Sequence, residues 1–180
     1  MIYRQGAVED TERGHQMYFA DSEEAVVLHR LLKLTNRLMA PFSMHLSHRY
    51  RISLNEFRLL MSIGALGRTA SHEVAELTGV NAMSISRAVA TLERNGRISV
   101  TVDEANRRRK WLSLTEEGER LYHLMKPQSE KVAHYLFDAI SPSELAAFGG
   151  IVEKLIERLD ATDENGNSVF LESTKPPAES

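Results

Sequence analysis

The sequence predicts a mainly α-helical protein with one small β-hairpin, and three observations support this class. Apolar residues recur at helical spacing along most of the 180 residues. Gly67, Gly79 and Gly96 each follow a short helical run and mark where it ends. The period changes to strand alternation at Arg97. The predicted order is therefore a long helix, three short helices, a hairpin and further helices.

Composition restricts the class of protein. The chain is 42% hydrophobic and 26% charged, enough to bury the core of about one domain. It has no cysteine, which excludes disulfides, thiolate metal sites, cysteine nucleophiles and thiol redox sensing. No apolar run approaches the roughly 20 residues of a membrane span, and no signal peptide is recognisable. We expect a cytoplasmic protein without a membrane partner.

The first long helix is predicted to begin at Ser22, whose hydroxyl can cap free N–H groups next to two glutamates. Pro41 removes one backbone hydrogen bond, so we expect a kink or break near Ala40. Residues before Ser22 mix acidic and apolar types. The resulting segments are an N-terminal arm at 1–21, a long helix at 22–50, a central lobe at 53–118, C-terminal helices at 119–161 and a disordered tail at 162–180.

The central lobe contains a predicted helix-turn-helix. Ser53 and Glu56 have the spacing of a capping box, and a helix follows them. A short helix at 71–78 ends at Gly79, where a left-handed residue belongs. The next helix, at 82–95, turns inward the side chains of Ile85, Val89 and Leu92. Two short helices joined by a tight turn are typical of the helix-turn-helix motif.

A β-hairpin follows this motif directly. Ile98, Val100 and Val102 alternate with polar residues, and 111–114 returns as a second strand. The tip at 104–110 is polar and basic. A helix-turn-helix followed by such a hairpin is a winged helix.

The C-terminal helices have their own start signals. Thr115 can cap the first of them, which Pro127 should kink. Ser141-Pro142-Ser143-Glu144 is a capping box with proline at the first helical position. Both terminal helical segments carry apolar stripes too long for a lone winged helix to cover, which indicates a homodimer.

Charge is unevenly distributed, although the whole chain carries only −3. Residues 82–115 contain seven basic and three acidic side chains, whereas residues 138–180 contain three basic and nine acidic ones. A basic middle in an acidic chain is expected of a protein that meets a polyanion with one face.

The helix at 82–95 and the hairpin tip are the predicted DNA-binding elements. Small and hydroxyl side chains let a helix approach base edges, and arginine can reach guanine or phosphate. Arginines on a wing can enter the narrow minor groove of A·T-rich DNA. The predicted DNA-contacting residues are Ala82, Met83, Ser84, Ser86, Arg87, Arg94, Asn106, Arg107, Arg108, Arg109 and Lys110.

The span 54–118 resembles the MarR family of bacterial transcriptional regulators. The resemblance rests on the order of elements and on Arg107-Arg108 followed by Leu114-Thr115-Glu116-Glu117-Gly118. The wing of that family typically reads Asp-x-Arg, and here Asn106 stands at the aspartate position and Arg108 at the arginine position. Asparagine can hydrogen-bond an arginine but cannot neutralise its charge.

The resemblance implies a homodimer that pairs its helices at 22–50 and 119–161 and presents two winged helices to a pseudo-palindromic operator. It also implies a small-molecule effector, often an aromatic acid, in a cleft between the dimerisation helices and the DNA-binding lobe at 53–118. Apolar walls beside a donor would suit such a ligand. The candidate effector-binding residues are Met44, His45, His48, Arg49, Phe57 and Met61.

The leading hypothesis is a transcriptional repressor that its effector releases from DNA. A metal-responsive regulator is one alternative, because His45 and His48 have metal-ligand spacing and some family members sense zinc. A winged helix that acts only through protein partners is another. An enzyme is not expected, because the chain lacks a phosphate-binding loop, a nucleophile elbow and paired carboxylates, and no cofactor is expected.

Overall fold

The computed structural model describes residues 22–104, 106 and 109–176. Its contacts divide the chain into two compact units, 1–124 and 125–180. The N-terminal arm lies outside the described residues. The elements of the first unit are α2 (Glu23–Tyr50), α3 (Leu54–Leu66), β1 (Thr69–Ala70), α4 (Ser71–Thr78), α5 (Ala82–Arg94), β2 (Ile98–Val102), β3 (Lys110–Leu114) and the first part of α6 (Glu116–Phe137).

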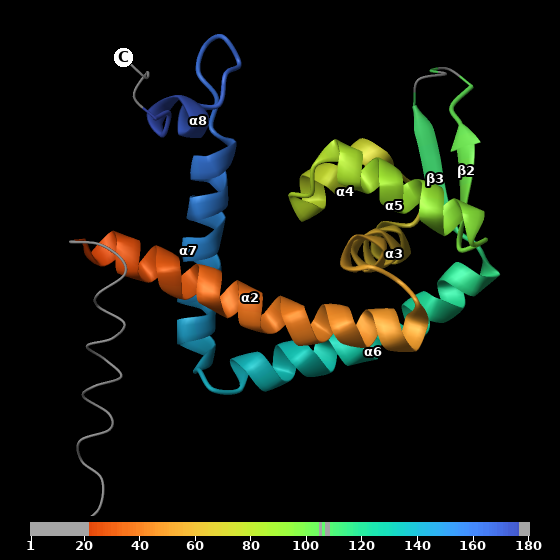
Figure 1. Cartoon of the computed structure of the whole chain (residues 1–180), viewed down its shortest axis with the longest axis horizontal. Helices are drawn as coiled ribbons and strands as arrows, with labels where there is room; N and C mark the ends of the chain where they lie inside the picture. Colours follow the sequence, from red (N-terminus) through yellow and green to blue (C-terminus); the bar gives the residue numbers. More distant parts are fainter. Residues whose placement is uncertain (1–21, 105, 107–108, 177–180) are drawn as a thin grey trace, which may run out of the picture. The chain divides into compact units, whose positions relative to one another are not determined.

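The helix-turn-helix and the hairpin are confirmed (Figure 1). α4 ends at Gly79, whose φ of 64° is the predicted left-handed cap. β2 and β3 pair antiparallel, with Val100 opposite Leu112. The short β1 adds a third strand on the other side of β3, so the sheet order is β1-β3-β2. Sequence reasoning missed β1 because two residues show no alternation.

The core of the first unit lies between α3, α5 and the sheet. Leu59, Leu60, Leu92 and Leu112 are fully buried there. Helix α3 begins with the predicted capping box: the Glu56 backbone N–H donates to the Ser53 hydroxyl, and the Glu56 carboxylate accepts from the Ser53 N–H. These local bonds fix where α3 starts, and the apolar face that follows anchors α5.

Helix α2 is continuous through Pro41, so the expected break does not occur. Proline removes one backbone donor, and the hydrogen bonds of the neighbouring turns maintain the helix. Ser22 caps its start, accepting from the Ala25 N–H at 3.3 Å. Helix α6 likewise runs through Pro127. Neither proline ends its helix.

The second unit contains the rest of α6, α7 (Pro142–Asp160) and α8 (Val169–Ser173). The capping box at Ser141 and Glu144 is present as predicted. The tail expected to be disordered instead contains a turn and a helix over residues 162–173. The Asp163 carboxylate accepts from two backbone N–H groups in the turn, and the Ser168 hydroxyl caps α8. These local side-chain bonds supply the order that the polar composition had argued against.

Within the described parts of the chain, no helix is both long and apolar enough to cross a membrane.

The start of α6 approaches the backbone of the hairpin closely. A Cβ atom at Gly118 would lie 2.0 Å from the Arg97 carbonyl oxygen. The Thr115 N–H also donates to that oxygen at 3.2 Å, and the Thr115 hydroxyl donates to the Gly96 carbonyl at 2.7 Å. Glycine at 118 is therefore required by space.

We predict that Gly118→Ala lowers the free energy of unfolding by about 1–3 kcal/mol, because the added methyl group forces backbone atoms apart. The matched control is Glu119→Ala, an exposed position of the same helix. It should change stability by less than about 0.5 kcal/mol. Urea unfolding measures both, and equal midpoints for the two variants would contradict this packing.

Candidate nucleic-acid interface

Helix α5 has one buried face and one exposed face. Ile85, Ala88 and Leu92 are buried toward α3, while Val89, predicted to face inward, is half-buried. The opposite face carries most of the predicted DNA-contacting residues. Ser84 is half-buried, and the exposed positions are Ala82, Met83, Ser86, Arg87, Ala90, Glu93 and Arg94. The helix therefore presents small side chains, a methionine, two arginines and one glutamate to solvent.

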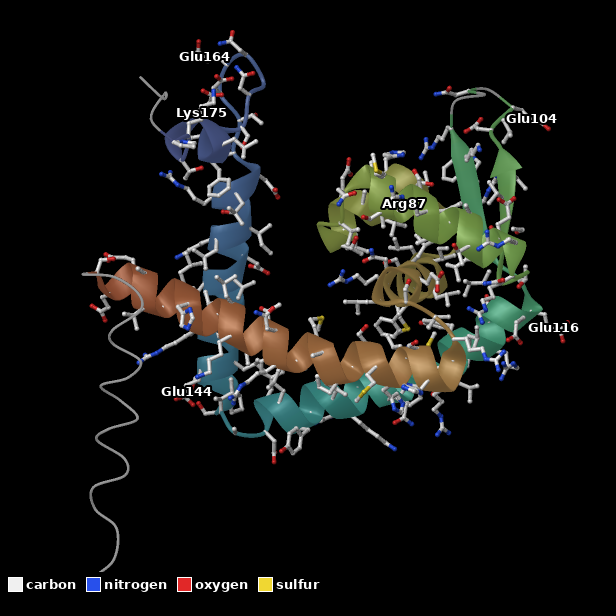
Figure 2. The ribbon with its side chains drawn as sticks, in the orientation of Figure 1. Arg87, Glu104, Glu116, Glu144, Glu164 and Lys175 are labelled. Carbon is white, nitrogen blue, oxygen red and sulfur yellow. The ribbon has the colours of Figure 1, made fainter. Side chains whose placement is uncertain are left out.

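The first turn of α5 is open to a ligand. The Asn81 side chain caps the helix by accepting from the Ser84 N–H at 2.9 Å. Met83 is 65% exposed, and its sulfur lies 3.4 Å from the Arg87 guanidinium. Among the described residues, Arg87 has no acidic partner. Figure 2 labels Arg87 on this helix. Its charge is available to a nucleic acid.

The wing is organised around Asp103. The Asp103 carboxylate accepts from the Trp111 indole N–H at 3.0 Å and from the Asn106 backbone N–H at 3.3 Å. The Asp103 N–H donates to the Arg109 carbonyl at 3.0 Å. Lys110 and Asn106 are exposed. Arg107 and Arg108 lie outside the described residues.

Arg109 points back toward the lobe. One guanidinium nitrogen lies 2.7 Å from a Glu73 carboxylate oxygen, and the guanidinium carbon sits 3.9 Å from the centre of the Trp111 ring. Arg68 also lies over this ring, at 4.9 Å. Charge-assisted hydrogen bonding and cation–π attraction both favour this placement. The arrangement connects the wing to α4, and the DNA contact expected of Arg109 stays a prediction.

Glu73 is held by three donors. Its carboxylate accepts from the Thr69 hydroxyl at 2.6 Å, from the Ala70 N–H at 2.8 Å and from Arg109. These hydrogen bonds, that of Thr69 foremost, hold the pKa of Glu73 below its ordinary value of 4.5. Sequence reasoning missed Glu73. Its place three residues after the N-cap, the spacing of a capping box, is the signal that could have found it.

The candidate effector residues differ in their exposure to solvent, and their role stays a prediction. Phe57 is buried and packs edge-to-face on Phe42, with ring centroids 4.9 Å apart, so it serves the core. Met61 is half-buried. The exposed members are Met44, His45, His48 and Arg49. Of the six, only Arg49 lines the cavity of about 510 Å³ at the end of α2.

The alternative of a metal-responsive regulator would need a further ligand beside His45 and His48. Among the described residues, no three histidine or acidic side chains are placed to hold one ion together, and this includes any group around His45 and His48. The ring of His45 instead lies edge-on to Tyr50, with centroids 6.1 Å apart.

We predict that Glu73 stabilises the protein in a pH-dependent way. Because its folded-state pKa is depressed, its contribution is complete above the unfolded-state pKa and is lost as the pH falls through the folded-state value. The urea midpoint of wild type should exceed that of Glu73→Gln by a constant amount above about pH 5.5, and this difference should shrink below about pH 4.5. Glu76→Gln, exposed on the same helix, is the control. A difference that grows toward low pH would contradict the prediction.

Three known proteins locate this chain among its relatives. It is 29% identical over 113 residues to the transcriptional repressor MprA of Escherichia coli K12, a match that covers 60% of this chain and 64% of that protein. The structure of Sco3205 from Streptomyces coelicolor, a MarR family regulator in complex with DNA, superposes with a TM-score of 0.71 at 21% identity, covering 80% of this chain and 92% of that one. BpsR of Bordetella bronchiseptica, whose DNA binding is regulated by 6-hydroxynicotinic acid, superposes with a TM-score of 0.63 at 22% identity, covering 72% and 97%.

The family model described as MarR family matches residues 52–110, which include α3, α4, α5 and β2. The matched region thus contains α5 and the helix α3 on which its buried face packs. The helix-turn-helix part of this chain, residues 52–110, therefore matches the model of the MarR family, and its fold is that of a solved MarR family regulator.

Proposed function

We propose that this chain is a sequence-specific DNA-binding repressor that acts as a homodimer and is released from its operator by a small effector. The observation that carries the proposal is the exposed face of α5, where Arg87 and Arg94 stand among small and hydroxyl side chains without an acidic partner in the described part of the chain.

In this proposal α5 enters the major groove. Its first two turns carry Ala82 and Ser86, short enough for the backbone to approach base edges, while Arg87 reaches a guanine or a phosphate. Met83 contacts a thymine methyl group. Arg94, the last residue of the helix, neutralises a backbone phosphate. The buried side chains on the opposite face of α5 prevent the helix from rotating about its axis, so these residues stay exposed.

The wing supplies the second contact. Its basic tip, residues 106–110, includes Arg107 and Arg108, which we assign to the minor groove, where narrow A·T-rich steps deepen the negative potential. Arg109 takes a different part. Its ion pair with Glu73 and its contact with the Trp111 ring hold this end of β3 close to α4.

The dimer is supported by apolar surface in the second unit. Ile151, Leu155 and Leu159 of α7 are 54%, 47% and 52% exposed and follow each other at four-residue spacing, which places them on one face. A second copy of this chain would cover that face. Two winged helices joined this way bind half-sites about one DNA turn, roughly 34 Å, apart, so the operator is pseudo-palindromic.

Repression and effector release are supported by two relatives. MprA is a transcriptional repressor, and 6-hydroxynicotinic acid regulates the DNA binding of BpsR. In a two-state dimer, an effector that binds better to the DNA-incompetent arrangement lowers operator affinity by population shift.

The test of DNA reading starts with fragments that the full-length protein selects from its genome. On a selected site, Arg87→Ala should weaken binding about 5- to 100-fold, the equivalent of ~1–3 kcal/mol for a lost base contact. If Arg87 binds phosphate instead, the slope of log affinity against log salt falls by about 1. Arg37→Ala, an exposed arginine of α2, is the matched control. Unchanged affinity for Arg87→Ala at matched salt would overturn the proposed role of α5.

The dimer is tested separately by light scattering. Wild type should have twice the chain mass of 20.3 kDa. Leu155→Glu should produce monomers, because a buried unpaired carboxylate in the apolar interface costs several kcal/mol. Glu157→Gln, an exposed position two residues away, should remain dimeric. A monomeric wild type, or a dimeric Leu155→Glu variant, would contradict the assigned interface.

A further inference from the structure

A cavity of about 510 Å³ lies at the junction of the end of α2, the start of the hairpin and the start of α6. All of its residues belong to the first compact unit. Its volume is in the range of pockets that hold small molecules. The lining residues are Arg49, Tyr50, Arg51, Arg97, Glu117, Arg120, Leu121 and Leu124.

The cavity is strongly cationic. Four arginines line it against a single carboxylate, that of Glu117. Arg120 holds this carboxylate through two hydrogen bonds, from Nε at 2.6 Å and from Nη2 at 2.8 Å. In the described part of the chain, neither Arg49 nor Arg51 has an acidic partner. After the Glu117–Arg120 pair is subtracted, three positive charges remain without compensation.

One of these arginines, Arg97, is held by backbone carbonyl groups at the end of α2. The Arg97 guanidinium donates to the carbonyl oxygens of Tyr50 at 3.1 Å and Arg51 at 3.2 Å, which are left free at the end of α2. Arg51 caps that helix in the left-handed conformation, with φ of 53°, and is the one non-glycine residue with positive φ in the described ranges. The guanidinium groups of Arg97 and Arg120 are thus held at the cavity wall before any ligand arrives, which lowers the entropic cost of binding.

The remaining walls are apolar. Leu121 is buried, Leu124 is 45% exposed, and the Tyr50 ring is half-buried. A ligand that matches both parts has a multiply charged head and a small hydrophobic body. A carboxylate brings one negative charge, whereas a phosphate monoester brings about −1.5 to −2 and three acceptor oxygens for guanidinium forks. We propose that this arginine cavity binds a small phosphate monoester with an apolar or aromatic body.

DNA phosphate is the competing source of the same chemistry, and the position of the cavity argues against it. Glu117 and Arg120 lie in the first turns of α6, next to the base of the hairpin, whereas Asp103 and Arg109 lie at its other end. Figure 2 labels Glu104 near the tip and Glu116 near the base, at opposite ends of the hairpin. A duplex that contacts the tip and the outer face of α5 leaves the cavity at the base free.

Arg97 connects this cavity to the wing. It directly precedes β2, and its carbonyl oxygen lies against Gly118 of α6. A phosphate that draws the Arg97 guanidinium toward itself weakens its bonds to the end of α2, and the hairpin then moves relative to α2. This regulatory consequence rests on the proposed function, whereas the binding itself does not.

The proposal is tested by titrating phenyl phosphate into the full-length protein without DNA and measuring the heat of binding by calorimetry. Wild type should show saturable binding, and Arg49→Gln should weaken it about tenfold, the effect of one lost charge-assisted contact. Arg49 is exposed at the rim and contributes no core packing, so this variant folds even if Arg97→Gln does not. Arg37→Gln, an exposed arginine of the same helix, should bind as wild type. Benzoate, which carries a single charge, should bind at least tenfold more weakly than phenyl phosphate.

Equal affinities of wild type and Arg49→Gln, benzoate binding as tightly as phenyl phosphate, or no saturable binding would each overturn the proposal. A DNA arm separates the two phosphate sources. Without ligand, Arg49→Gln should bind a selected DNA site as wild type does. A loss of affinity with a smaller salt slope would mean that DNA occupies the cavity, and would also overturn it. Failure of wild type to bind any DNA would refute the proposed function. The calorimetry, which contains no DNA, would still decide whether the cavity binds phenyl phosphate.

Discussion

The packing of α5 against α3 determines which face of α5 remains exposed. Ile85 and Leu92 are almost completely buried against a core that includes Leu59 and Leu60. Burying such side chains stabilises the fold by about 1.5–3 kcal/mol each. A rotation of α5 that exposed them would therefore cost more free energy than new interactions of its surface charges could supply. The outward direction of Arg87 is therefore a consequence of core packing, and the proposed DNA contact depends on it.

The hairpin is held to this lobe at both ends. Near its tip, Arg109 joins Glu73 and the ring of Trp111, and Asp103 accepts from the indole of the same tryptophan. At its base, Arg97 bonds the last carbonyls of α2 while its own carbonyl lies against Gly118. The regulatory link that we propose between the arginine cavity and the wing runs through these two sets of contacts.

Local signals were enough to predict most of the fold. The capping boxes at Ser53 and Ser141 and the left-handed Gly79 lie within a few residues of what they control, so the sequence shows them directly. The Glu73–Arg109 pair joins residues 36 apart, and the bonds of Arg97 to α2 join residues 46 and 47 apart. No local sequence pattern indicates contacts between residues so far apart. The pairing of Glu73 with Arg109 and the arginine cavity were therefore missed. Helix α8 was missed for another reason, because its order comes from a few polar side-chain bonds rather than from an apolar stripe.

Contact between the outer face of α5 and DNA bases can be tested by site-specific photocrosslinking. A benzophenone amino acid replaces Met83, which is 65% exposed, or Leu77 of α4, which is 62% exposed, in the full-length protein bound to a selected DNA site. We expect a crosslink from position 83 to bases inside one half-site and a much weaker one from position 77. A complex that crosslinks from position 77 but not from position 83 would contradict it.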